Sequence, residues 1–256
     1  MASRQFQCDR LNVNIYPTRQ AMGQAAGQAF LHALQTRLKY QDQVRTIFAA
    51  APSQAEFLQF LCAQAQVDWQ RVTAFHMDEY LGLPADSKAS FGYFLSQHLF
   101  DQLPFGEVHF IDSTHDNPAQ EAQYYAQLLK EEPIDLVAMG IGENGHIAFN
   151  DPPVADFNDP KWVKLVALDE VCRQQQVNDG AFPNLAAVPS QAITLTIPAL
   201  LSADEIICVV PGPTKQQAVK NTLEGSIESA CPASILRRHQ AAALFLDEAA
   251  ASLLEN

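Results

Sequence analysis

Short apolar runs alternate along this chain with longer segments in which apolar residues recur at helical spacing. A short apolar run has the length of a buried strand, and strands that alternate with amphipathic helices are typical of βαβ units. The pattern therefore predicts an α/β fold with a mostly parallel sheet. The expected strands are Leu11–Tyr16, Val44–Ala49, Arg71–His76, Val108–Ile111, Ile134–Met139, Val163–Leu168, Ala192–Thr196, Glu205–Val210 and Ala242–Leu246.

Three segments between these strands carry helix signals. The apolar residues of Thr18–Tyr40 recur near helical spacing, which predicts a long amphipathic helix. Ser53 and Glu56 have the spacing of a capping box, so we expect a second helix to start there. A third helix is expected over Thr214–Leu223, because the preceding Pro213 is tolerated in a first helical turn.

The composition favours one compact domain over residues 1–256. Hydrophobic residues make up 48% of the chain, which is enough for a packed core. With 16 Lys and Arg against 29 Asp and Glu, the formal charge of −13 argues against binding to nucleic acid or to an anionic membrane. The five cysteines are widely scattered, without the close pairs of zinc sites, and the start of the chain lacks the apolar core of a signal peptide. We expect no metal, no membrane partner and a cytoplasmic location.

Two turn-rich stretches lie on either side of a segment beyond the middle of the chain. The first covers Asn150–Pro160 and the second covers Asn178–Pro189. Long loops of this kind often form lids that close over a site at the ends of strands. We therefore expect a lid or flap segment around residues 150–190.

The most informative motif is residues 136–152, Leu-Val-Ala-Met-Gly-Ile-Gly-Glu-Asn-Gly-His-Ile-Ala-Phe-Asn-Asp-Pro. Gly140 and Gly142 let the backbone turn tightly after a predicted strand and approach a ligand. His146 can titrate near neutral pH and act as acid or base, although a loop histidine could equally be a surface residue. The glycine spacing formally matches a dinucleotide-binding motif, but Pro152 and Pro153 break the helix that such a motif needs. This argues against an NAD cofactor.

Two further clusters follow predicted strands. Asp78 and Glu79 come directly after Arg71–His76, and Lys215 follows Glu205–Val210. Ligands of open α/β sheets bind outside the carboxyl ends of the strands, where a carboxylate can serve as general base. Backbone amides at a helix N-terminus, together with a lysine, can hold a phosphate. Each cluster also has a purely structural interpretation. Asp78 and Glu79 could belong to a solvated turn after the strand, and Lys215 could be a solvent-facing lysine at an ordinary helix start.

Taken together, these motifs resemble the glucosamine-6-phosphate deaminase family. The resemblance rests on Met77–Tyr80, on residues 140–152 and on Gly212–Lys215, and it extends over almost the whole chain. The Gly-His-Ile-Ala-Phe-Asn run is its most specific part. The related 6-phosphogluconolactonases usually have Gly-His-Thr-Ala-Ser there, and Asp-Glu-Arg where this chain has Asp-Glu-Tyr. Both differences point to the deaminase branch.

The resemblance implies a Rossmann-like three-layer α/β/α sandwich that converts a hexosamine 6-phosphate to a ketohexose 6-phosphate and ammonia, with no metal or organic cofactor. By this likeness Asp78 moves the C2 proton toward C1, and His146 opens the pyranose ring with the help of Asn144 and Asp151. The partner is a small-molecule sugar phosphate, and family members range from monomers to hexamers, so a homo-oligomer is left open. The expected substrate-binding residues are Ser53, Gly140, Gly142, Arg173 and Lys215.

Four positions depart from the family pattern. Asn144 stands where Asp is frequent, and Asp151 stands where Glu is usual, so a loop shift is expected before its shorter side chain reaches the histidine. The phosphate loop Thr-Gly-Gly-Thr is replaced by Ala50–Ser53, which keeps a hydroxyl but loses glycines and one amide donor. The family's phosphate-binding arginine falls on Gln176, and Arg173, about one helical turn earlier, is the expected substitute.

The leading hypothesis is therefore an aldose–ketose isomerase and deaminase that converts glucosamine 6-phosphate to fructose 6-phosphate. The altered phosphate loop and Asp151 leave galactosamine 6-phosphate open as the substrate. A 6-phosphogluconolactonase-like hydrolase is a second alternative, which Tyr80 and residues 147–150 disfavour. A non-catalytic sugar-phosphate-binding regulator is the third, and the presence of both Asp78 and His146 argues against it.

Overall fold

A sheet of eight strands forms the centre of this computed structural model, which describes residues 1–64, 66–84 and 86–255. The strand order is β1-β2-β11-β10-β7-β3-β4-β6, and all neighbouring strands are parallel except β1 and β2. The predicted mostly parallel sheet is confirmed, with β1 as an additional edge strand. The strands are β1 (Arg4–Cys8), β2 (Leu11–Tyr16), β3 (Val44–Phe48), β4 (Val72–His76), β6 (Glu107–His109), β7 (Leu136–Met139), β10 (Glu205–Val210) and β11 (Ala242–Asp247).

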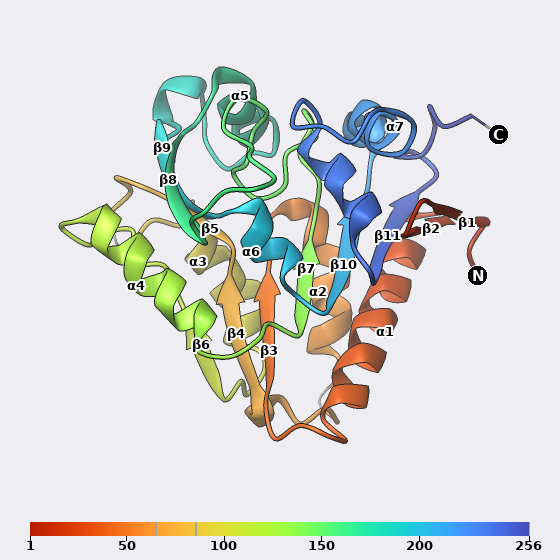
Figure 1. The fold of residues 1–256 in the computed structure, drawn as a ribbon, viewed down its shortest axis with the longest axis horizontal. Helices are drawn as coiled ribbons and strands as arrows, with labels where there is room; N and C mark the ends of the chain where they lie inside the picture. Colours follow the sequence, from red (N-terminus) through yellow and green to blue (C-terminus); the bar gives the residue numbers. More distant parts are fainter. Residues whose placement is uncertain (65, 85, 256) are drawn as a thin grey trace.

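The order of the strands reverses between β3 and β7. From β3 the chain adds β4 and β6 on one side, and from β7 it adds β10 and β11 on the other. The arrows of these strands point the same way in Figure 1, so their carboxyl ends share one edge of the sheet. Open α/β sheets bind ligands at such a reversal point, because the connections leave it in opposite directions and a crevice remains between them.

Helices cover both faces of the main sheet. Leu136 and Ala138 of β7 face one apolar core, whereas Val137 and Met139 face the other, because successive strand residues point to opposite faces. This confirms the predicted three-layer α/β/α sandwich. The first core is covered by α1 (Arg19–Arg37), α2 (Ala55–Cys62), α3 (Phe91–Leu95) and the helical turn Ser96–Phe100, and the second by α4 (Pro118–Lys130), α6 (Ile197–Leu201) and α7 (Gln216–Glu224).

A second sheet of three antiparallel strands lies beside the carboxyl ends of the main sheet (Figure 1). It consists of β5 (Asp78–Tyr80), β9 (Gln191–Leu195) and β8 (Val163–Ala167). The predicted strands near residues 163–168 and 192–196 are confirmed as β8 and β9, but they do not belong to the mostly parallel main sheet. Both segments are strands, but a short apolar run does not encode its partner, which is chosen by packing. Together with α5 (Glu170–Asn178), this sheet encloses a small apolar cluster of its own.

The three predicted helix starts have different outcomes. Thr18 caps α1, since its hydroxyl accepts a hydrogen bond from the Ala21 amide at 3.1 Å, and the helix after Pro213 is also confirmed. The capping box of the second helix is wrong. The cap residue of α2 is Gln54, which makes no side-chain cap hydrogen bond, and Glu56 instead accepts a hydrogen bond from Arg19 of α1 at 2.6 Å. Glu56 therefore forms an ion pair with another helix instead of capping its own helix.

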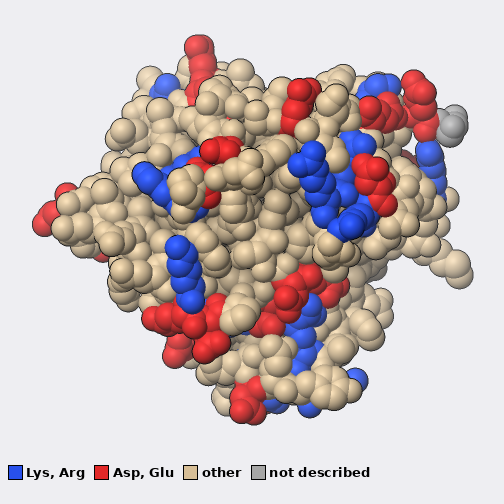
Figure 2. Space-filling model, viewed as in Figure 1, with Lys and Arg blue, Asp and Glu red and all other residues tan. Residues whose placement is uncertain are grey.

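Charged side chains are mixed on the face drawn in Figure 2. Lys and Arg occur there in several separate groups that alternate with Asp and Glu, so the described residues on this face form no continuous basic surface. Among the described helices, none is both long and apolar enough to cross a membrane.

Candidate active site

A cavity of about 560 Å³ opens at the carboxyl ends of β3, β4, β7 and β10, where the strand order reverses. This is within the usual range for small-molecule sites. Its floor consists of the residues that follow these four strands, and its opposite wall consists of the residues before α3 and the second half of α5. The predicted site residues that line it are Ser53, Asp78, Gly140, Gly142, His146 and Lys215.

The glycines after β7 make room for the imidazole of His146. A Cβ added at Gly142 would lie 2.2 Å from Cε1 of His146, so the ring stands where a side chain at position 142 would be. Gly145 has a φ of +86°, a left-handed conformation that favours glycine, and its amide closes a turn onto the Gly142 carbonyl at 3.0 Å. Ala148 has a φ of 47° and also lines the cavity. The motif therefore serves mainly to position one ring.

His146 is oriented by two acceptors on one ring nitrogen. Its Nδ1 lies 2.9 Å from Oδ1 of Asp151 and 2.8 Å from Oδ1 of Asn144, and the Asn144 amide nitrogen donates to the same Asp151 oxygen at 2.8 Å. Since both partners are acceptors, Nδ1 carries the proton and Nε2 has a free lone pair. Asp151 reaches His146 directly, so the expectation that this contact needs a loop shift is wrong.

The carboxylate of Asp151 is suited to this role. Burial raises its pKa, but the hydrogen bond and charge of His146 and the Asn144 amide outweigh this effect, so the pKa lies below its ordinary value. Asp151 therefore stays ionised and holds the imidazole in one tautomer.

Asp78 is a buried carboxyl group at the start of β5 with only 7% of its surface exposed. Burial raises its pKa well above the ordinary value, and the charges of Glu79 and Asp151 add to the shift. A carboxylate that is poorly solvated when ionised is a stronger base than one in water. Asp78 has the chemistry of a general base that faces the cavity.

Glu79 is not part of the described cavity lining and instead holds the first turn of α3. Its carboxylate accepts hydrogen bonds from the amides of Tyr80 at 2.9 Å, Phe91 at 3.1 Å and Gly92 at 2.8 Å. Burial nevertheless raises its pKa to about 7. Because Glu79 adjoins Asp78, this contact fixes the position of the base relative to the wall that carries Lys88 and Ser90.

One end of the cavity is suited to an anion. Lys215 lies in the helical turn Pro213–Lys215 after β10, and it is 5% exposed. Burial lowers its pKa, while the charges of Asp179 and Glu143 act in the opposite direction. Ser53, in the turn after β3, lines the same cavity and accepts a hydrogen bond from Gln54 Nε2 at 3.2 Å. An ammonium and a hydroxyl that line one cavity are groups that bind a phosphate.

The structure does not bring Arg173 to the cavity. Its guanidinium donates to the carbonyls of Leu185 at 2.7 Å and Val188 at 2.9 Å, and it is absent from the described cavity lining. The expectation that it substitutes for the family's arginine is therefore corrected: it ties α5 to the chain that follows. Gln176, one helical turn later, does line the cavity and accepts a hydrogen bond from the Tyr80 hydroxyl at 2.5 Å.

Sequence reasoning missed several residues of the cavity wall. Lys88 lies in the loop before α3, and no motif marks it as a site residue. Gln175 and Gln176 are adjacent polar residues on α5 that are both buried, which is unusual for glutamine. Gln176 stands where the family pattern has its phosphate-binding arginine, and Gln175 is marked in the sequence only as a polar neighbour within the predicted lid.

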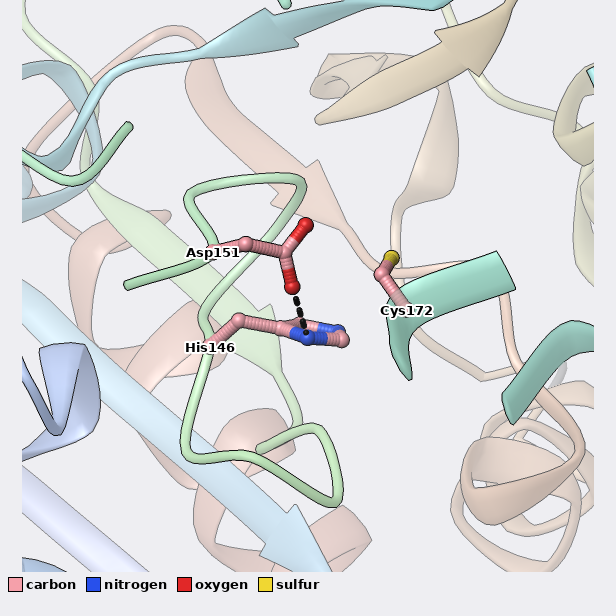
Figure 3. A group of neighbouring side chains, drawn as sticks. All are labelled: His146, Asp151 and Cys172. Atoms are coloured by element: carbon pink, nitrogen blue, oxygen red, sulfur yellow. Dashed lines mark ion pairs between the residues drawn. The ribbon is translucent and has the colours of Figure 1, made fainter. Parts of the chain in front are cut away.

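One group of described side chains has the composition of a metal site. His146, Asp151 and Cys172 each offer one ligand atom, and these atoms lie within 4.8 Å of one another (Figure 3). The expectation of no zinc-type site rested on the spacing of cysteines alone, whereas this group combines three residue types from two elements.

Comparison with known proteins agrees with the geometry. The model of the family described as glucosamine-6-phosphate isomerases/6-phosphogluconolactonase matches residues 17–245. Proteins named glucosamine-6-phosphate deaminase from Bacillus thuringiensis (strain Al Hakam) and Bacillus anthracis are each 38% identical over 188 residues, which cover 73% of this chain and 70% of those proteins.

Two solved structures show the same fold. A monomeric glucosamine-6-phosphate deaminase superposes with a TM-score of 0.87 at 27% identity, covering 94% of this chain and 99% of that one. A 6-phosphogluconolactonase from Thermotoga maritima superposes with a TM-score of 0.74 at 19% identity, covering 92% of this chain and 99% of that one.

Proposed function

Because this chain belongs to the family of glucosamine-6-phosphate isomerases and 6-phosphogluconolactonases, we propose that it converts glucosamine 6-phosphate and water to fructose 6-phosphate and ammonia. The observation that carries the proposal is the convergence of Asp78, His146 and Lys215 on one cavity. A base, a proton shuttle and a cation for the phosphate are the three groups that this reaction needs.

His146 performs the first step, the opening of the pyranose ring. Its Nε2 takes the proton of the C1 hydroxyl and returns a proton to the ring oxygen, so that the C1–O5 bond breaks and an aldehyde forms. The hydrogen bond from Nδ1 to Asp151 stabilises the transient imidazolium, because the two opposite charges are 2.9 Å apart in a buried site.

Asp78 performs the second step. It removes the proton from C2, which the adjacent C1 carbonyl makes acidic, and delivers it to C1. The double bond moves to C2 and nitrogen, and the C1 oxygen gains the proton that the 2-ammonium group loses, so that C1 becomes a CH2OH group. Water then adds to the resulting iminium carbon, and ammonia leaves to give the ketose. The high pKa of Asp78 assists the removal of the proton, provided that the carboxyl is ionised before the substrate binds.

The phosphate is assigned to Lys215 and Ser53, with Lys88 as a second cation at the wall of the cavity. Among the described lining residues there is no arginine, so two lysines take the place of a bidentate guanidinium. Lysine binds phosphate as a point charge without fixed geometry. We therefore expect the phosphate to be held less rigidly than by an arginine.

The segment around residues 150–190 is proposed as a lid. Its support is that Gln175 and Gln176 of α5, and Asp179 directly after this helix, line the cavity. Turn-rich stretches connect both ends of the segment to the rest of the chain. A sugar phosphate that closes the lid should slow amide exchange in α5 more than in α1, and equal slowing would contradict a local closure. We propose a cytoplasmic location, and its support is that the five cysteines are free thiols, as is usual for proteins of a reducing compartment.

The decisive experiment gives the purified chain glucosamine 6-phosphate, galactosamine 6-phosphate and 6-phosphogluconolactone in parallel. Ammonia release from the first substrate, with solvent deuterium appearing at C1 of the ketose, supports the proposal. Faster turnover of galactosamine 6-phosphate would show that the galacto epimer is the substrate. Acid release from 6-phosphogluconolactone would support the lactonase alternative instead. Thermal stabilisation by a sugar phosphate without any turnover would indicate a binding protein.

A further inference from the structure

Cys172 faces the catalytic pair from a different element. It lies in the first turns of α5, 1% exposed, whereas His146 and Asp151 belong to the loop after β7 (Figure 3). The three side chains present a nitrogen, an oxygen and a sulfur within 4.8 Å of one another. Nothing in the proposed deamination uses the thiol.

One oxygen of Asp151 makes no hydrogen bond of good geometry. Oδ1 accepts from both His146 and Asn144, whereas Oδ2 is buried and has no well-formed hydrogen bond with any described residue. The thiol of Cys172, a weak donor, is the remaining side-chain partner of this carboxylate. A buried carboxylate oxygen held only by a weak donor costs free energy, and a cation that displaced the thiol proton would satisfy both groups.

We propose that His146, Asp151 and Cys172 bind a thiophilic divalent cation of the zinc type, and that the bound cation inhibits the enzyme. Zinc accepts nitrogen, oxygen and sulfur ligands together, and three protein ligands with one open position are common. Magnesium and calcium prefer oxygen ligands and would be poorly held by this set. Zinc–ligand bonds of about 2.0–2.3 Å place tetrahedral ligands some 3.3–3.8 Å apart. The site is therefore completed when Cys172, now within 4.8 Å of the other two ligands, moves inward and the close pair of His146 Nδ1 and Asp151 Oδ1, now 2.9 Å apart, separates to admit the cation.

The position of the cation explains the inhibition. It binds Nδ1, the nitrogen that faces Asp151, and replaces the proton shared there. That proton moves to Nε2, and the Cys172 thiol releases its own proton to solvent on binding. Nε2 then has no free lone pair toward the cavity, so His146 can no longer accept the proton of a sugar hydroxyl. The inhibitory effect rests on the proposed function, whereas binding of the cation does not.

The experiment adds Zn²⁺ to the purified chain and measures ammonia release, and it separately titrates Co²⁺ as a spectroscopic substitute. We expect inhibition that a chelator reverses, and a thiolate-to-cobalt charge-transfer band. Cys172→Ser and Cys172→Ala should abolish the band and raise the zinc concentration for half-inhibition by about tenfold or more. Cys62→Ser, which alters a partly buried thiol on α2, is the matched control and should behave as the unaltered chain.

The outcomes separate the two proposals. A cobalt band that persists in both Cys172 variants, or is absent from the unaltered chain, would overturn the metal site. A band without zinc inhibition would overturn the inhibitory role. If no sugar phosphate is turned over, the proposed function fails while the cobalt titration still tests the site.

Discussion

The imidazole of His146 occupies the space that a side chain at Gly142 would fill, with Cε1 only 2.2 Å from the position of an added Cβ. The backbone at Gly142 has no left-handed torsion, so the requirement for glycine there comes from the ring and not from the chain. The glycines of the family motif thus leave the space that the ring of His146, the proposed catalytic group, occupies.

Gly142→Ala should therefore disable the site without unfolding the protein. The methyl group pushes the His146 ring away from Asp151, and a misplacement of this size lowers kcat/KM by about a hundredfold. The melting temperature should change little, because a side chain that faces a cavity can move. In a His146→Ala background the same substitution should have almost no further effect on activity, and additive losses would contradict the steric explanation.

Asp78→Asn should abolish deamination and stabilise the fold at neutral pH. Removing the base lowers the rate by about 10²–10⁴-fold. Since the pKa of Asp78 is higher in the folded than in the unfolded state, the stability of the unaltered chain falls as pH rises through the folded pKa. The gain from Asn should thus vanish at low pH, where the carboxyl is protonated in both states, and grow as the pH rises.

Thermal unfolding as a function of pH checks this prediction. Asp204→Asn, which alters an exposed carboxyl group, is the matched control and should show no such trend. A destabilised Asp78→Asn protein at neutral pH would show that the carboxylate is stabilised rather than strained by its surroundings.

Lys215→Met should weaken recognition of the phosphate. Loss of a charge-assisted contact costs about 1.5–3 kcal/mol, which lowers kcat/KM for glucosamine 6-phosphate by about 10- to 100-fold. Turnover of unphosphorylated glucosamine should hardly change, so the ratio of the two rates is the measurement. Lys220→Met in α7, where the lysine pairs with Glu224 at 3.1 Å, should leave this ratio as it is. An equal decrease in kcat/KM for both sugars would show that Lys215 does not bind the phosphate.

Arg173→Met should affect stability more than catalysis. Its guanidinium holds the carbonyls of Leu185 and Val188, and their loss should cost about 1–3 kcal/mol of unfolding free energy. The KM for the sugar phosphate should change less than in Lys215→Met. Denaturant unfolding and steady-state kinetics of both variants test this prediction. An unchanged unfolding midpoint of Arg173→Met with a strongly raised KM would show that Arg173 binds the phosphate after all.

The sequence by itself determined most of the elements and the residues proposed for the chemistry. Apolar runs predicted most strands because burial on both faces requires such runs, and the glycine-histidine motif predicted the position of His146 because its neighbours in sequence are its neighbours in space. Asp78 and Lys215 were also predictable, since the carboxyl ends of parallel strands share one edge of a sheet.

Only the tertiary structure decided which groups meet across distant elements. Packing between segments far apart in sequence decided three features: β9 pairs with both β5 and β8, Glu56 contacts Arg19, and Arg173 points away from the cavity. The same is true of Cys172, which reaches Asp151 from a helix, and of Lys88, which no motif marks. Local patterns specify local contacts, whereas side chains that join distant elements are placed by the fold as a whole.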